Sequence, residues 1–257
     1  MRPILALANL VIKEIFRKKD FYVALFLIFI ILFYASQLQF YNVQHTVRYL
    51  MELGLLLIYF FSVILTATLA ARQYAVEIQS RTCHALLAKP LSRMGFIAGK
   101  FLGSFAAGAA CFSVFYALFI LIAWPKAGGG LSVQVAAQAF YLFLLNLLVF
   151  TAMVSGLSHY LTVGANVTAS VILYLLINTY GPGLRQETAR LMWPARLAGD
   201  FLYFFLPHFE FFDLRQRFIH GWEALSPGLA ALLTLYAFLY VFIFLFAGWL
   251  KFRRRPL

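Results

Sequence analysis

The chain has 257 residues, of which 63% are hydrophobic, 18% are aromatic and only 12% are charged, with a net charge of +12. Soluble domains carry about 25% charged residues because their surfaces face water, so this composition, with a mean hydropathy of +0.85, excludes an ordinary soluble domain. At about 20 apolar residues per helical span, the length predicts six spans with their loops and no soluble catalytic domain. Cys83 and Cys111 show neither a disulfide framework nor metal-ligand spacing, so we interpret them as small buried residues.

The first 20 residues predict an amphipathic helix at the membrane surface. Apolar and polar side chains alternate at helical spacing, with Ile4, Leu7, Val11 and Ile15 on one side and Asn9, Lys13 and Arg17 on the other. Basic helices of this kind lie in the headgroup layer with their cations facing anionic lipid. A signal peptide is the alternative, but no small-x-small cleavage site follows the next apolar run. We therefore expect a retained first span.

Six apolar runs predict the spans. They cover about 21–39, 53–71, 100–124, 135–155, 166–181 and 229–250. The small and polar cluster SGLSHYLTVGAN (155–166) predicts the turn between the fourth and fifth spans. The Gly-Pro-Gly sequence at 181–183 predicts a sharp end to the fifth span.

Loop charge predicts the orientation. Six spans put both termini on one side, and that side holds 14 of the 21 Lys and Arg residues and three acids, against seven basic and six acidic residues opposite. The positive-inside rule therefore predicts that both termini and the 72–100 segment face the cytoplasm. The expected location is a bacterial inner (plasma) membrane. The turn between the fourth and fifth spans carries no charge, so only parity places it.

The charged segment RQYAVEIQSRTCHALLAKPLSRMGFIAGKFLG (72–103) predicts a helix, a corner and a second helix. Glu77 and Arg81 have the spacing and order of a helix-surface ion pair. Pro90 disfavours helix at Lys89 and should stop the first helix there, and Ser92 is placed to cap the next one. One side of the first helix is less polar, lined by Tyr74, Ile78, Thr82, Ala85 and Leu86. A loop that only sets topology is the alternative, but it would not need an apolar helix face, a fixed corner and an ion pair together. We call residues 72–95 the elbow.

The elbow resembles a known family. A Glu, then a Thr, then LLAKPLSR, an apolar step and GKFLG are similar to the cytoplasmic loop of type-2 ABC (ATP-binding cassette) exporter permeases, most of all the branch associated with copper-enzyme maturation. Residues 77–103 carry the specific likeness, and the rest of the chain matches in outline. Arg81 departs from the pattern, because many members have Gly before the Thr.

The resemblance implies the fold and the partners. The fold would be an all-α integral membrane protein, a single permease domain over 1–257, with six transmembrane helices, an N-terminal interfacial helix (1–20), a cytoplasmic coupling helix between spans 2 and 3, and an external insertion (185–226). The elbow would seat in a groove of a separate ABC ATPase, present in two copies, which holds ATP and Mg. The permease would form a dimer with a second copy or a homologous chain in the lipid bilayer, with no nucleic acid. The residues implied for ATPase coupling are Glu77, Arg81, Thr82, Leu86, Lys89, Pro90 and Arg93.

The chain itself shows no nucleotide-binding motif. GFIAGKF (95–101) has too short a spacing between its glycines for a phosphate-binding loop, and Phe101 stands where Ser or Thr must hold magnesium. Gly95, Gly99 and Gly103 repeat every fourth residue, which favours close helix packing in lipid. We therefore expect a chain that is not an enzyme and holds no cofactor.

The predicted span centres contain no ionisable residue, which disfavours a proton-coupled path. Asn146 and Asn178 are the deepest polar side chains, and we expect each to bond a neighbouring helix. Lys100 should extend to the cytoplasmic interface, and His159 should be a satisfied or solvated turn residue.

The insertion 185–226 is dense in aromatic residues. It predicts helices that lie at the membrane surface or dip into it, anchored by Trp193, Tyr203 and Trp222. The insertion contains four possible metal ligands, His208, Glu210, Asp213 and His220. Their spacing matches no strong metal signature, so we expect these residues to form local ion pairs. No metal site is predicted.

The predicted function is a permease subunit of an ABC transporter that forms an export path. A membrane scaffold that transports nothing and an ion-coupled secondary transporter are the alternatives. An apolar path does not distinguish lipid, glycan, peptide, drug, or a sulfur or metal species as the substrate.

Overall fold

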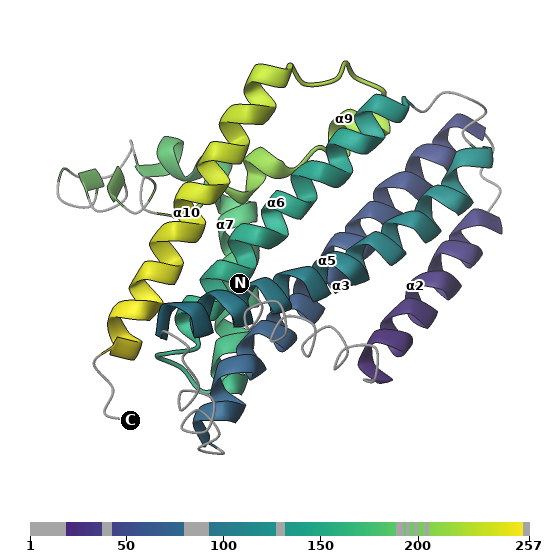
Figure 1. Ribbon diagram of the computed structural model, residues 1–257. Coiled ribbons are helices and arrows are strands. Elements are labelled where there is room, and N and C mark those ends of the chain that lie inside the picture. The colour runs from purple at the N-terminus through teal and green to yellow at the C-terminus, as the bar shows by residue number, and fades with distance from the viewer. Residues whose placement is uncertain are drawn as a thin grey trace.

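The computed structural model describes residues 19–37, 43–79, 93–126, 132–188 and 206–253, with short pieces between 193 and 203. These residues form helices and connecting turns and contain no strand. The helices, coloured along the chain in Figure 1, are α2 (Lys19–Gln37), α3 (Val43–Gln79), α5 (Arg93–Lys126), α6 (Val133–Leu157), α7 (Val163–Thr188), the 3-10 turn η1 (Phe209–Phe212), α9 (Arg215–His220) and α10 (Pro227–Arg253).

Five of the helices are long and apolar enough to cross a membrane, with their apolar stretches at Arg48–Gln73, Met94–Lys126, Val133–Leu157, Val163–Gly181 and Pro227–Arg253. These five correspond to the second to sixth predicted spans. The first predicted span, 21–39, is helical over most of its length as α2, but its apolar stretch, Leu25–Tyr34, is shorter. The fold is therefore an all-helical, multi-pass membrane protein. Residues 1–18 of the predicted interfacial helix lie outside the described residues.

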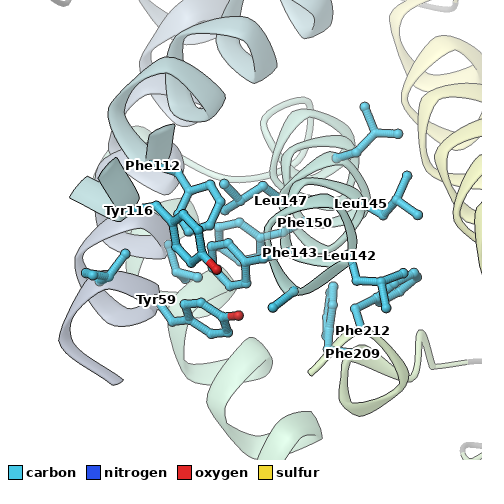
Figure 2. Packing of buried hydrophobic residues seen from close by; sticks show 14 of the residues in the cluster. Tyr59, Phe112, Tyr116, Leu142, Phe143, Leu145, Leu147, Phe150, Phe209 and Phe212 are labelled. Atoms are coloured by element: carbon cyan, nitrogen blue, oxygen red, sulfur yellow. The ribbon is translucent and has the colours of Figure 1, made fainter. Parts of the chain in front are cut away.

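Helix α6 forms the centre of the bundle. It packs against α10 on one side and against α3 and α5 on the other, while α2 lies at the edge beside α3 and α5 (Figure 1). The core between α3, α5 and α6 is aromatic, and Figure 2 shows its rings. Tyr59 stacks on Phe143 with ring centroids 3.7 Å apart, and Phe112 lies 4.5 Å from Phe143. Such pairs add stabilisation beyond the area that they bury.

The turn between α6 and α7 falls where the sequence predicts it, at residues 158–162. The Asn166 amide nitrogen donates to the Val154 carbonyl at 3.1 Å and to the Ser158 hydroxyl at 2.8 Å, and the Ser170 hydroxyl donates to Asn166 Oδ1 at 3.0 Å. These bonds satisfy buried polar groups at the helix ends, as a membrane interior requires. The polar cluster in the sequence is therefore the cap of this helical hairpin.

One end of the bundle brings together three segments that are distant in sequence. His159, in the α6–α7 turn, is buried with its ring 5.6 Å from that of Phe252 near the end of α10. Phe252 in turn stacks on Phe96, in the first turn of α5, at 5.9 Å. The α6–α7 turn thus lies at the same end as the start of α5, in agreement with the parity of the predicted spans, although loop charge gave no indication of it.

The prediction that Gly-Pro-Gly ends the fifth span sharply is wrong for the helix. The apolar stretch does stop at Gly181, but α7 continues through Pro182 to Thr188. A proline removes one backbone donor, which here would have bonded the carbonyl of residue 178. Helices in membranes tolerate such a loss where nearby groups satisfy the freed carbonyl.

Candidate functional site

The structure describes α3 and α5, the two helices on either side of the elbow's corner, which we call the arms. It does not describe the corner itself. Arg81, Thr82, Leu86, Lys89 and Pro90 lie within residues 80–92, outside the described residues. Glu77 lies in the last turn of α3 and Arg93 is the first residue of α5, so both stand where the arms meet the corner. Their assignment to ATPase coupling stays a prediction.

The arms themselves interlock. Lys100 on α5 is only 6% exposed, and its ammonium donates to the side-chain oxygen of Gln73 on α3 at 3.1 Å. The expectation that Lys100 extends to the interface is therefore wrong: the neighbouring arm supplies a hydrogen-bond acceptor within the protein, and a charged group buried in this way is retained when it is bonded. The bond ties the two arms together close to the elbow.

Glycines allow a close approach of α3 and α5 further along. A Cβ placed on Gly108 would overlap the hydroxyl of Thr66, and one placed on Gly54 would lie 2.7 Å from a ring carbon of Phe119. Of the predicted packing glycines, Gly99 and Gly103 are buried and Gly95 is half-buried, and their packing partner stays a prediction. Small residues at helix contacts are how membrane helices pack tightly, so the two arms form one unit.

The insertion returns to the middle of the bundle. Phe209 and Phe212 are fully buried, and Phe209 lies 4.8 Å from the Tyr174 ring and 6.4 Å from that of Phe150 (Figure 2). Asn146, which bonds this loop, is 13 residues into the 25-residue α6, close to the midpoint of that helix. By contrast, Trp193 and Trp222 are 76% and 54% exposed, while Tyr203 is half-buried with its ring 4.3 Å from that of His208; their role as interfacial anchors stays a prediction. Residues 206–221, which we call the re-entrant loop, dip into the bundle.

Side chains of the bundle satisfy the backbone of the re-entrant loop. The Asn146 amide donates to the Phe209 carbonyl at 3.4 Å, and the Tyr240 hydroxyl donates to the Leu206 carbonyl at 3.1 Å. The His208 backbone N–H donates to the Tyr236 hydroxyl at 2.9 Å. Non-helical backbone at membrane depth is stable only where protein supplies such partners. Asn146 therefore bonds a neighbour as predicted, but that neighbour is a loop and not a helix.

Asp213 and Arg215 form an ion pair on this loop. The Arg215 guanidinium donates to both carboxylate oxygens, with contacts of 2.6 to 3.0 Å, and the Arg215 backbone N–H donates to Asp213 Oδ1 at 2.9 Å. Burial by itself would lower the pKa of Arg215, but the hydrogen bonds and charge of Asp213 outweigh it and raise that pKa, so the guanidinium stays charged. The guanidinium carbon lies 5.4 Å from the centre of the Tyr59 ring, a cation–π contact.

A cavity of about 210 Å³ opens beside the ion pair, between α3, α6, α7 and the re-entrant loop. Its polar lining consists of Tyr59, Asn146, Tyr174, Asn178, Asp213 and Arg215. Sequence reasoning placed Asn146 and Asn178 at depth and expected local ion pairs in the insertion. It did not bring them together, because nothing in the sequence gives the depth to which the insertion returns.

Two further titratable groups, His208 and Glu210, lie on the re-entrant loop itself. Burial lowers the pKa of His208 and raises that of Glu210, so each neutral form is favoured. His208 stacks on Phe211 at 5.1 Å, and its ring lies 3.2 Å from the Tyr236 hydroxyl. Within the described part of the chain, no group of three or more His, Cys, Asp or Glu residues is placed to hold a metal.

Long apolar helices and a loop that re-enters the bundle define a multi-pass, all-helical membrane protein. The family model for "ABC-2 family transporter protein" matches residues 5–257. The chain therefore belongs to the ABC-2 transporter family, whose members are the permease components of ABC transporters and not the catalytic subunits. No curated protein matches the chain as a relative.

Proposed function

We propose that this chain is the permease subunit of an ABC exporter and that it couples to a separate ATPase through the elbow. The observation that carries the proposal is the family match over nearly the whole chain. The paired arms supply a mechanical reason, because a push on the elbow acts on two helices that Lys100 and the Gly108 contact hold together.

In this proposal the working unit is a dimer of this chain, or of this chain and a homologue, with two ATPase subunits docked on the cytoplasmic side. ATP and Mg bind in the ATPase. Closure of the ATPase subunits moves the elbows, and α3 and α5 transmit the motion to the bundle and open the path outward. Helix α2 serves as the first of six spans, and both termini face the cytoplasm of a bacterial inner membrane. The relation to copper-enzyme maturation stays a prediction from the elbow sequence.

The test is co-purification with candidate ABC ATPase subunits from the same organism, followed by ATPase assays in lipid nanodiscs. We expect Glu77→Ala and Pro90→Gly to change the ATPase rate while the complex still assembles. Glu52→Ala is the matched control for the first, because Glu52 is an exposed residue near the other end of α3, about 37 Å away at 1.5 Å per residue. Pro227→Gly, at the exposed first residue of α10, is the control for the second.

Three results would contradict the proposal. Failure of any nucleotide-binding subunit to associate would exclude coupling. Association without any effect of the elbow variants would favour a scaffold. Substrate flux that persists without ATP but collapses with the ion gradient would favour a secondary transporter.

A further inference from the structure

We infer that the cavity beside Asp213 and Arg215 binds the uncharged, hydrogen-bonding head of an amphipathic ligand. This inference rests on the proposed permease function, because it names the chemical class of what the path carries. The head would be rich in hydroxyl or amide groups, as in a sugar or a glycerol unit.

The cavity contains polar atoms that the protein leaves without partners. Tyr59 is 6% exposed and Asn146 is 2% exposed, yet the Tyr59 hydroxyl and Asn146 Oδ1 accept or donate no hydrogen bond within the described residues. Both residues line the cavity. Leaving a buried polar atom unpaired costs about 1–3 kcal/mol. Other buried atoms of the described residues, among them the hydroxyls of Ser62, Thr66 and Ser104, also lack a partner, but those residues do not line this cavity. The Tyr59 and Asn146 atoms differ because they lie on the wall of one cavity, where a ligand can supply the bonds.

Arg215 adds donors to the same wall. Its bonds to Asp213 use Nε, Nη2 and the backbone N–H, and among the described residues no hydrogen bond uses Nη1, whose two N–H groups can donate to an acceptor. The Asp213 oxygens, in contrast, are occupied by Arg215. The cavity therefore presents guanidinium donors, the hydroxyls of Tyr59 and Tyr174, and the side-chain amides of Asn146 and Asn178. A head with hydroxyl groups, each both a donor and an acceptor, matches this mixture.

The charges in the cavity favour a neutral head. Asp213 cancels the charge of Arg215, and the described residues that line the cavity include no other charged side chain. An anionic head would have to lose its water without a net positive charge to receive it, and burying an unpaired charge is far more costly than burying a hydroxyl that becomes hydrogen-bonded.

The size of the cavity and its rim indicate an amphipathic ligand. Sites that enclose a whole drug-sized ligand measure roughly 300–1,000 Å³, so about 210 Å³ encloses only part of such a molecule. Leu56, Phe60 and Leu175 also line the cavity and are 50%, 42% and 42% exposed. An apolar body attached to the head would lie along these side chains of α3 and α7.

Photolabelling tests the inference without needing the ATPase. The purified chain in phosphatidylcholine nanodiscs would be irradiated with dodecyl glucoside that carries a diazirine on the first carbon of its alkyl chain. Dodecyl phosphate and dodecane with the same diazirine are the comparison probes. We expect the glucoside to label α3 and α7 around Tyr59 and Leu175 several-fold more than either comparison probe, and unlabelled octyl glucoside to compete.

Variants make the test specific. Tyr59→Phe removes only the unpaired hydroxyl, so it should leave the thermal stability equal or higher while labelling by the glucoside falls about five- to tenfold, the effect of one lost hydrogen bond. Asn146→Leu should also reduce labelling. Tyr141→Phe is the control for the first, because Tyr141 is an exposed residue of α6 that bonds Thr234 and does not line the cavity. It should label like the parent.

Equal labelling by the dodecane probe would show that the site is an apolar groove with no preference for a polar head. Stronger labelling by the dodecyl phosphate probe would show that the site prefers an anionic head. Unchanged labelling of Tyr59→Phe would also overturn the inference. Each of these outcomes can occur while the ATPase still responds to the elbow, in which case the permease function stands. Specific labelling in a chain that binds no ATPase would instead support the ligand site and contradict the proposed exporter function.

Discussion

Gly108→Ala tests whether the two arms of the elbow act as one unit. The added methyl would overlap the hydroxyl of Thr66 and lie 3.1 Å from its methyl carbon and 3.2 Å from its Cβ. The arms must then separate locally or Thr66 must move. Thr66→Ala removes both of the nearest atoms, and the Thr66 hydroxyl has no hydrogen-bond partner in the described structure, so the double variant should relieve the overlap.

The magnitude follows from the cost of overpacking. Inserting a methyl group into a packed core costs about 1–3 kcal/mol, whereas Thr66→Ala loses a methyl contact but also an unsatisfied hydroxyl and should stay within about 1 kcal/mol of the parent. At about 2–4 °C per kcal/mol for a chain of this size, Gly108→Ala should lower the melting temperature by about 2–12 °C. The double variant should recover most of that loss, which gives a coupling of about 1–2 kcal/mol between the two sites.

The assay is thermal unfolding in nanodiscs followed by intrinsic fluorescence, with ATPase stimulation measured in parallel. Gly183→Ala is the matched control, because a Cβ at Gly183 meets no atom within 4 Å. If Gly108→Ala unfolds like the parent, or if Thr66→Ala fails to rescue it, the close approach of the arms is wrong. If stability recovers in the double variant but ATPase stimulation does not, the arms pack as described without transmitting the elbow's motion.

Three further predictions concern the re-entrant loop and the segment that joins it to α10. Phe209→Ala should destabilise the protein by about 3–5 kcal/mol and increase cleavage of the loop in limited proteolysis, whereas Phe211→Ala, which is 46% exposed on the same turn, should do neither. Gln138→Leu should cost about 1–3 kcal/mol in unfolding experiments, since the Gln138 amide donates to the Leu225 carbonyl at 2.9 Å and accepts from the Leu225 N–H at 2.8 Å, between the loop and α10; the exposed Gln134→Leu is its control, and equal effects of the two variants would refute this role of Gln138. Burial raises the pKa of Glu210, so the native state holds a proton that the unfolded chain releases near pH 4.3. The free energy of unfolding therefore falls as the pH rises from there through the raised pKa. Glu210→Gln should remove this fall, so its melting temperature should change less than that of the parent between about pH 4.5 and 7.

The sequence predicted the parts of the fold that depend on local patterns. Uninterrupted apolar runs predicted five of the spans, because a helix that faces lipid must be apolar along its whole length. The polar cluster around Asn166 predicted the α6–α7 turn for the same reason: polar groups at depth persist only where they cap or bond each other. The Asp213–Arg215 pair, two residues apart, was also within reach of sequence reasoning as a local ion pair.

The two errors have different physical origins. Lys100 looks like a residue that extends to the interface until α3, which is distant in sequence, places Gln73 beside it. Pro182 looks like a helix end because it removes one backbone donor, but the helix continues through it to Thr188. A proline therefore predicts a weak point in a helix more surely than it predicts the end of one.

The re-entrant loop shows why the site was harder to predict than the fold. Phe209 and Phe211 are the same residue type, two positions apart in one turn, yet Phe209 is fully buried and Phe211 is 46% exposed. The sequence of a 3-10 turn at the membrane surface would not differ from that of a 3-10 turn in the middle of the bundle. What distinguishes them is the supply of hydrogen bonds to the loop backbone from Asn146, Tyr236 and Tyr240, because irregular backbone at that depth needs those partners. The polar side chains that hold the loop at depth thus also place Arg215 and Asn146 on the wall of the same cavity. The cavity is therefore a consequence of the hydrogen bonds that satisfy the loop backbone.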